Sequence, residues 1–133
     1  MRTDIRDRNS RSVPVTITAV TATVTGATTG TIGANATFVN VTCDTATKIV
    51  ILPVPKREML GKTITIVRGA TNAFELRSNS PTTVGINATV GANVELACAA
   101  NTISYATLIT MTDWKVITLA GGITGITYGT PDA

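Results

Sequence analysis

Residues 13–25 read VPVTITAVTATVT, so that Val, Ile and Ala alternate with Thr along most of the segment. No charged residue occurs from Ser12 to Cys43, and Thr makes up about a fifth of the whole chain. β-Branched side chains at a period of two fit a pleated, half-buried sheet surface and lose rotamer freedom in a helix. The pattern therefore predicts an all-β body.

The composition sets limits on the core and on the surface. With 133 residues the chain is most simply one domain, and a chain of this length buries roughly two-thirds of its unfolded surface on folding. Aromatic residues make up 4% of the chain, so the core has to be built from Val, Ile, Leu and Ala. Charged residues make up 14%, against roughly 25% in an average domain. Because a surface so poor in charge is often covered by other protein, we expect an oligomer or a larger lattice.

Strand candidates follow one another at short intervals, separated by turn signals of Gly, Pro and Asn. They are residues 13–24, 36–43, 47–52, 62–68, 73–77, 82–88, 92–98, 102–109, 114–119 and 123–128. Short strands at such spacing predict a β-sandwich, a jelly roll or a barrel. Residues 23–33 and 122–129 are low in complexity but show no fixed period over three copies, so no solenoid is predicted. Residues 56–60 form one helical turn at most.

Residues 1–12 differ in composition from everything that follows. Arginines alternate with Asp4 and Asp7, and apolar side chains are almost absent. This predicts an extended polar arm, then a sandwich body over residues 13–128 and a frayed tail over residues 129–133. The arm's arginines either dock onto an acidic protein surface through bidentate carboxylate contacts or belong to a solvated tail. These candidate partner-binding residues are Arg2, Arg6, Arg8 and Arg11.

The two cysteines are expected to be buried thiols that pack as small hydrophobic side chains. Cys43 shares a strand face with Val39 and Val41, and Cys98 shares one with Val94 and Leu96. A disulfide that joins two inner faces stays open as an alternative. A metal site is not expected, because the chain has no His and no third Cys to complete four-coordination.

The sequence does not favour an enzyme or a cofactor. Gly61-Lys62-Thr63 resembles the end of a phosphate-binding loop, but Lys56 stands where that motif needs its first Gly, and a strand rather than a helix follows. Without His, a Ser-His-Asp or Cys-His triad cannot form, and only a Ser-Lys variant stays open. The acids are scattered singly, although paired carboxylates could still meet in space, and they are Asp44, Glu58, Glu75, Glu95 and Asp113.

Nucleic acid and membrane partners are not expected either. The net charge is +3, and the body lacks a basic stripe interleaved with aromatic residues. Nowhere do ~18 apolar residues occur in a row, and residues 1–8 lead into no apolar segment of the kind found in secretory signals. We therefore expect the chain to fold in a cytoplasm.

Two pairs of segments carry a resemblance to a known group of proteins. Residues 45–55 (TATKIVILPVP) precede 60–68 (LGKTITIVR), and residues 91–96 (GANVEL) precede 112–117 (TDWKVI). They resemble the β-module that recurs in virion surface proteins of tailed bacteriophages: tail-fibre and head-fibre segments and capsid decoration (cement) proteins. In those proteins a strand ends in Leu-Pro, a loop leads to Gly-Lys-Thr and a second strand, and a late strand carries Trp-x-Val-Ile. The similarity covers roughly residues 45–119.

The resemblance implies a β-sandwich or jelly-roll-like subunit, assembled as a homotrimer, with a structural or adhesive role and no catalytic residues. The chain is short and has no coiled-coil stalk or extended repeats, which favours a compact decoration protein over a complete fibre. Closed symmetry would also cover the uncharged strands of residues 13–43, whose free edges would otherwise aggregate.

The expected function is therefore that of a capsid decoration protein on the virion surface, bound to the major capsid protein or another shell protein. An arm of about a dozen residues extends some 40 Å and can staple a neighbouring capsomer. One alternative is a phage fibre or spike module that attaches to a host receptor through loops such as residues 68–80 or 120–128. A remote alternative is an ice-binding β protein, because Thr-x-Thr pairs such as residues 16–18, 21–23 and 63–65 could present ranks of hydroxyl groups.

Overall fold

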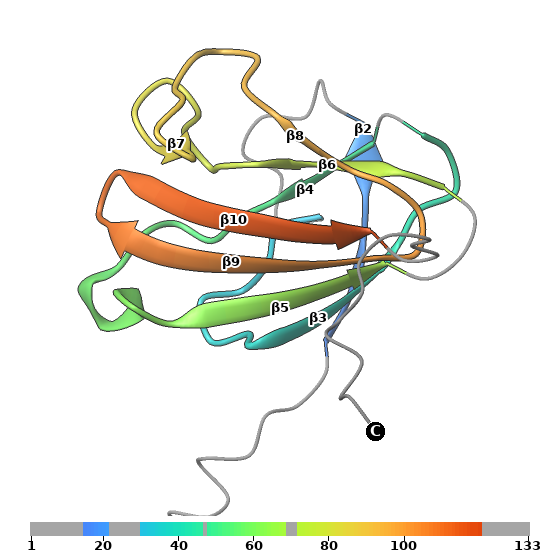
Figure 1. Cartoon of the computed structure of the whole chain (residues 1–133), viewed down its shortest axis with the longest axis horizontal. Coiled ribbons are helices and arrows are strands. Elements are labelled where there is room, and N and C mark those ends of the chain that lie inside the picture. The colour runs from blue at the N-terminus through green and yellow to red at the C-terminus, as the bar shows by residue number, and fades with distance from the viewer. Residues whose placement is uncertain (1–14, 22–29, 47, 69–71, 121–133) are drawn as a thin grey trace, which may run out of the picture.

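The computed structural model describes residues 15–21, 30–46, 48–68 and 72–120, which form one all-β domain of two sheets (Figure 1). Apart from the short 3-10 turn η1 (Arg57–Met59), these residues contain no helix. Sheet A contains β1 (Val15–Thr18), β3 (Phe38–Thr42), β5 (Thr63–Arg68), β9 (Thr102–Thr110), β10 (Asp113–Ala120) and β7 (Gly85–Ile86), in that spatial order. Sheet B contains β2 (Val20–Thr21), β4 (Lys48–Ile51), β6 (Phe74–Arg77) and β8 (Leu96–Cys98).

The chain passes from one sheet to the other after every strand from β1 to β8. Successive strands within a sheet are therefore stacked, and β1, β3 and β5 are parallel, as are β4 and β6. One circuit of the chain takes 24 residues from Val15 to its partner Val39, 27 from Phe38 to Thr65, and 26 from Lys48 to Phe74. This is solenoid-like stacking.

The jelly-roll expectation is therefore wrong, although the all-β prediction is confirmed. A jelly roll is a double sheet built from antiparallel Greek keys, whereas parallel neighbours join β1, β3 and β5 here. The expectation that the chain is not a solenoid was also wrong, because it relied on the absence of a fixed period in the sequence. The circuits differ in length by up to three residues, so stacked strands do not repeat at constant spacing along the chain.

Most of the strand segments were predicted at nearly the right place, but residues 13–24 do not form one strand. Within that segment β1 belongs to sheet A and β2 to sheet B, so the chain turns a corner at the buried Ala19. The Ala19 amide donates a hydrogen bond to the Thr42 carbonyl at 2.9 Å, which holds the corner against β3. The predicted arm (1–12), the strand at 123–128 and the tail (129–133) lie outside the described residues.

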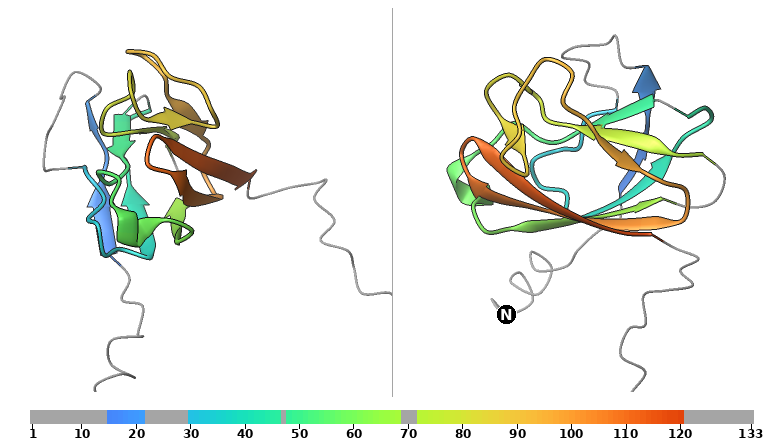
Figure 2. Two further views of the ribbon diagram at one scale, coloured as in Figure 1. Left: turned by 90° about the vertical axis from the view of Figure 1, so that its left-hand side faces the viewer. Right: turned by 45° about the horizontal axis from the view of Figure 1, so that its top comes forward.

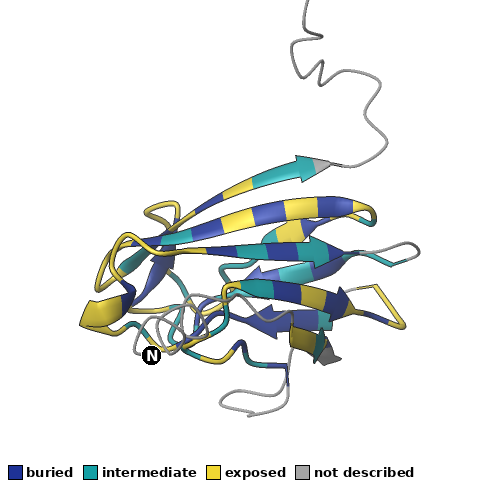
Figure 3. Ribbon diagram, turned by 90° about the horizontal axis from the view of Figure 1, so that it is seen from below, coloured by how far each residue is buried: buried dark blue, intermediate teal, exposed yellow. Residues whose placement is uncertain are grey.

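The core lies between the two sheets (Figure 2). Along β9 the side chains alternate, so that Ser104, Ala106 and Leu108 are buried while their neighbours face outward (Figure 3). Small branched side chains fill most of the core, as the composition predicted, and the two large aromatic side chains Phe74 and Trp114 are buried among them.

The last two long strands close the stack. β10 pairs with β9 antiparallel, and β9 pairs with β5, so the hairpin covers the edge of the parallel stack. On the far side of β10, the Asn87 side chain takes the place of a strand backbone: its Nδ2 donates to the Val116 carbonyl at 3.1 Å, and its Oδ1 accepts from the Val116 amide at 2.9 Å. These two hydrogen bonds satisfy the backbone amide and carbonyl of Val116 at the edge of β10, next to the short β7.

Candidate interaction surface

Sheet A turns two rows of mostly apolar side chains away from the core. The strand register places Asn40, Val67, Ile103 and Leu119 in one row. The adjacent row contains Phe38, Thr65, Tyr105 and Ile117. The apolar members of the two rows are together called the apolar face: Phe38, Val67, Ile103, Tyr105, Ile117 and Leu119.

Several side chains of the apolar face are open to solvent in the isolated chain. Ile117 is 59% exposed, and Ile103 and Tyr105 are each 36% exposed. The alternating pattern of the strands explains this, because the neighbours of these residues in sequence point into the core (Figure 3). A contiguous, rimmed apolar patch of this kind is typical of a protein contact surface.

Hydroxyl groups border the apolar face on both sides. Beyond one row, Thr63 Oγ1 and Thr107 Oγ1 share a hydrogen bond of 2.6 Å, and Lys115 stands beside Thr107. Beyond the other row, Thr18 Oγ1 and Thr42 Oγ1 lie 3.1 Å apart. The rim is therefore polar but carries little charge.

Sheet B turns ionisable side chains outward instead. The Arg77 guanidinium lies 2.9 Å from the Glu95 carboxylate and also donates to the Ala92 carbonyl. Leu76 pairs with Leu96, so Glu95 comes to lie opposite Arg77 and diagonal to Glu75. A hydrogen bond with Glu95, together with burial and the negative charge of Glu95, raises the pKa of Glu75. Two of the acids that are far apart in sequence therefore do meet.

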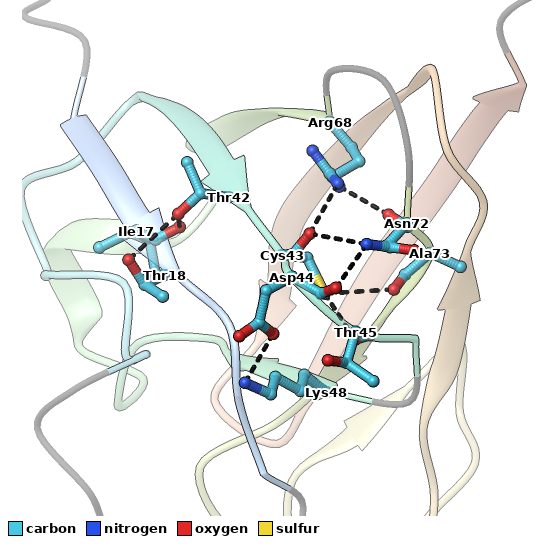
Figure 4. Close-up of polar contacts among 10 residues, drawn as sticks. All are labelled: Ile17, Thr18, Thr42, Cys43, Asp44, Thr45, Lys48, Arg68, Asn72 and Ala73. Carbon is cyan, nitrogen blue, oxygen red and sulfur yellow. Dashed lines mark hydrogen bonds and ion pairs between the residues drawn. The ribbon is translucent and has the colours of Figure 1, made fainter.

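Arg68 is buried at the end of β5 and binds β3 and the connections that lead from sheet A to sheet B (Figure 4). Its Nε donates to the Asn72 carbonyl at 2.7 Å, and its terminal nitrogens donate to the carbonyls of Cys43 at 3.1 Å and Val41 at 3.3 Å. The Asn72 side chain in turn donates to the carbonyls of Cys43 and Asp44. The segment proposed as a receptor loop at residues 68–80 thus begins in the core and contains β6.

Both cysteines are buried and free, which confirms the prediction of two buried thiols. The Cys43 thiol donates to the carbonyls of Thr45 at 3.0 Å and Ala73 at 3.3 Å. The Cys98 thiol lies 3.5 Å from Ser104 Oγ, and burial raises the pKa of Cys98. No disulfide joins the two residues.

The remaining candidate sites receive little support from the described residues. Arg2, Arg6, Arg8 and Arg11 lie outside them, so the arm has no described geometry. Within residues 15–21, 30–46, 48–68 and 72–120, no three His, Cys, Asp or Glu side chains gather as a metal site would require. In the same ranges, no helix has the length and apolar character needed to cross a membrane.

No protein-family model, curated protein or solved structure matches this chain.

Proposed function

We propose that this chain is a structural protein of a virus shell, a capsid decoration protein that binds the outer surface and stabilises contacts between capsomers. The observation that carries the proposal is the apolar face, which leaves a patch for protein contact open on a domain with few charges. In this proposal the chain acts as a homotrimer and needs no catalytic group and no cofactor.

The β-module resemblance points to the same function, and three of its four segments contain strands, whereas residues 91–96 reach only the first residue of β8 (Leu96–Cys98). Residues 45–55 include β4, residues 60–68 include β5, and residues 112–117 begin β10. The Trp of the late strand, Trp114, is fully buried, so this part of the pattern serves the core. Any binding function of the module would then come from its outward side chains.

The contact with the shell is assigned to the arm. Four arginines within residues 1–12 supply planar guanidinium groups, which bind carboxylates in bidentate geometry. An acidic surface of the major capsid protein or of another shell protein is therefore the partner that suits the arm. A reach of about 40 Å for an extended arm allows one chain to hold two capsomers.

The test is to locate the chain on virus particles from its natural source and then remove the arm. Gradient-purified particles are probed with an antibody raised against residues 15–120. We expect the chain to cosediment with the shell, and a variant without residues 2–11 to lose shell binding and to leave the shell less resistant to heat. Replacing Lys62 by Ser serves as a matched control, since it removes an exposed positive charge outside the arm.

Particles that lack the chain would overturn the proposal, and unchanged binding without residues 2–11 would overturn the role of the arm. Antibody label on the tail instead of the shell would replace decoration by the fibre or spike alternative.

A further inference from the structure

We propose that residues 85–89, here called the clip, are an autoinhibitory contact that keeps the edge of β10 from pairing with a strand of a second copy of this chain. The clip contains β7 and continues through a two-residue turn at Asn87 and Ala88. The inference goes beyond the proposed function and does not depend on it. It is carried by the contacts between the clip and β10 and by the backbone conformation of the turn.

The edge of β10 is a place where another strand could add. β10 pairs with β9 on one side, and on the other side the described part of the chain offers it only β7, at its first two residues. Farther along, the backbone groups of Val116 point away from β9, toward Asn87. Alternate residues of a strand point the same way, so the backbone groups of Thr118 face this edge too. An antiparallel copy of β10 would complement the edge, because antiparallel partners exchange both of their hydrogen bonds.

The clip occupies this edge through its backbone and through one side chain. The Gly85 amide donates to the Thr112 carbonyl at 2.8 Å. The Asn87 amide donates to the Trp114 carbonyl, also at 2.8 Å. The Asn87 side chain then reaches beyond β7 and bonds the amide and the carbonyl of Val116 at 2.9 and 3.1 Å. One Asn side chain therefore fills the position that the backbone of an added strand would take.

Charged side chains give the same edge little protection. Charges along an edge strand are a common obstacle to pairing with another chain. Over residues 114–119 of β10 the sequence supplies Lys115 alone. The protection of this edge is therefore assigned to the clip.

The turn of the clip is held in a conformation that suits only one of its two residues. Asn87 and Ala88 both have positive φ, 53° and 67°, as a two-residue hairpin turn of this kind requires. Asn tolerates this region, whereas Ala is unfavourable there because of its Cβ. The Ala88 amide donates to Asp113 Oδ1 at 2.8 Å, at the start of β10. A strained backbone persists where its surroundings hold it, and here β10 supplies that hold.

Gly85 shows how closely the clip lies against its surroundings. A Cβ at this position would be 2.8 Å from the Thr89 carbonyl oxygen and 3.2 Å from Asp113 Oδ1. A side chain at Gly85 would therefore push the clip away from the edge. Replacing Asn87 acts differently, because it removes the two hydrogen bonds to Val116 without crowding the clip.

The first experiment measures the solution mass of the full chain by light scattering over a range of concentrations. We expect Asn87→Ala and Gly85→Ala to exceed the mass of wild type increasingly as the concentration rises, because their β10 edges can pair. Asn101→Ala is the control for the first variant, since Asn101 also has a positive φ (56°) but precedes β9 instead of binding β10. Gly33→Ala is the control for the second, because a Cβ there meets no atom within 4 Å. Both controls should keep the mass of wild type.

A second experiment separates edge pairing from loss of the fold. Amide hydrogen exchange, followed by NMR at low concentration, should be about tenfold faster at Val116 in Asn87→Ala than in wild type, because this amide has lost its acceptor. Exchange at Ala106, which lies opposite Val116 on β9, should not change. At high concentration the Thr118 amide of the same variant should exchange more slowly, because it then donates to the second copy.

Wild-type masses for both Asn87→Ala and Gly85→Ala would overturn the inference, as would equal association of the two controls. Unchanged exchange at Val116 in Asn87→Ala would show that the clip does not close the edge. Faster exchange at Ala106 in that variant would assign the gain in mass to unfolding, and this too would overturn the inference.

Discussion

Sheet A and sheet B share one core but present different side chains to the outside. Sheet A turns out the apolar face, with Ile117 as its most exposed member, whereas sheet B turns out the ion pair of Arg77 and Glu95. The inward side chains of both sheets pack closely in the same core, so they are mostly apolar in both. The outward positions are free to differ: sheet A leaves apolar side chains exposed there, whereas sheet B pairs opposite charges in side chains that are only 13% and 19% exposed.

The largest difference in the free energy of unfolding is expected between an inward and an outward side chain of the same strand, β9. Leu108 is fully buried and Ile109, its neighbour in β9, is 47% exposed and lies outside the apolar face. Leu108→Ala should lower the free energy of unfolding by about 2–5 kcal/mol, because it leaves a cavity between the sheets. Ile109→Ala should change it by less than about 0.5 kcal/mol. Urea unfolding of the two variants measures both values, and equal losses would contradict the assignment of sides.

An intermediate loss of stability is expected at Arg68, which binds β5 to β3 and to the loops that lead from sheet A to sheet B. Arg68→Lys should cost about 2 kcal/mol, because one ammonium group cannot replace a planar guanidinium that reaches the carbonyls of Val41, Cys43 and Asn72. Arg57→Lys, at an exposed position of η1, is the matched control and should be neutral within about 0.5 kcal/mol. Thermal unfolding of both variants tests this, and a neutral Arg68→Lys would show that the buried contacts contribute little.

The smallest effect is expected at Glu75 on the outer face of sheet B, and it is a change in how the free energy of unfolding depends on pH. The pKa of Glu75 is raised above its ordinary value of 4.5 in the folded chain. Its stabilising contribution is therefore complete below about pH 4.5 and is lost as the pH rises through the folded pKa. Glu75→Gln should flatten this decline in the free energy of unfolding, measured by urea unfolding between pH 4 and 8.

Asp44 provides the control of opposite sign for that measurement. A hydrogen bond from Lys48, at 2.6 Å, lowers the pKa of Asp44, so the contribution of this group is lost as the pH falls and not as it rises. Asp44→Asn should leave the decline above pH 4.5 in place. A decline that persists in Glu75→Gln would show that another group causes it.

The strands could be predicted from the sequence because alternation is a local property. Residues 62–68 and 102–109 were expected as strands, and β5 and β9 lie there. The choice of partner strand could not be predicted, because it depends on circuits of 24–27 residues that no constant period reveals. The corner at Ala19 was missed for a related reason, since alternating residues look the same on either sheet.

The two charged features differ in how far the sequence could have revealed them. Arg68 has the same parity as Ile64 and Ile66 in β5, so its place on the inward side could have been read from the strand pattern. The approach of Glu75 to Glu95 left no such signal, because it requires the pairing of β6 with β8. A prediction of the apolar face would have required two things: which side chains of each strand point outward, and the order of the strands in sheet A.

The pairing of β5 with β9 also has a consequence for synthesis on the ribosome. Thr107 follows its partner Thr63 by 44 residues, so β5 is translated well before the strand that covers its edge. Until residues 102–110 emerge, the nascent stack of β1, β3 and β5 presents a row of free backbone amides and carbonyls to other chains. A chain that terminates early, before β9, keeps that edge open permanently and is the form most prone to aggregate.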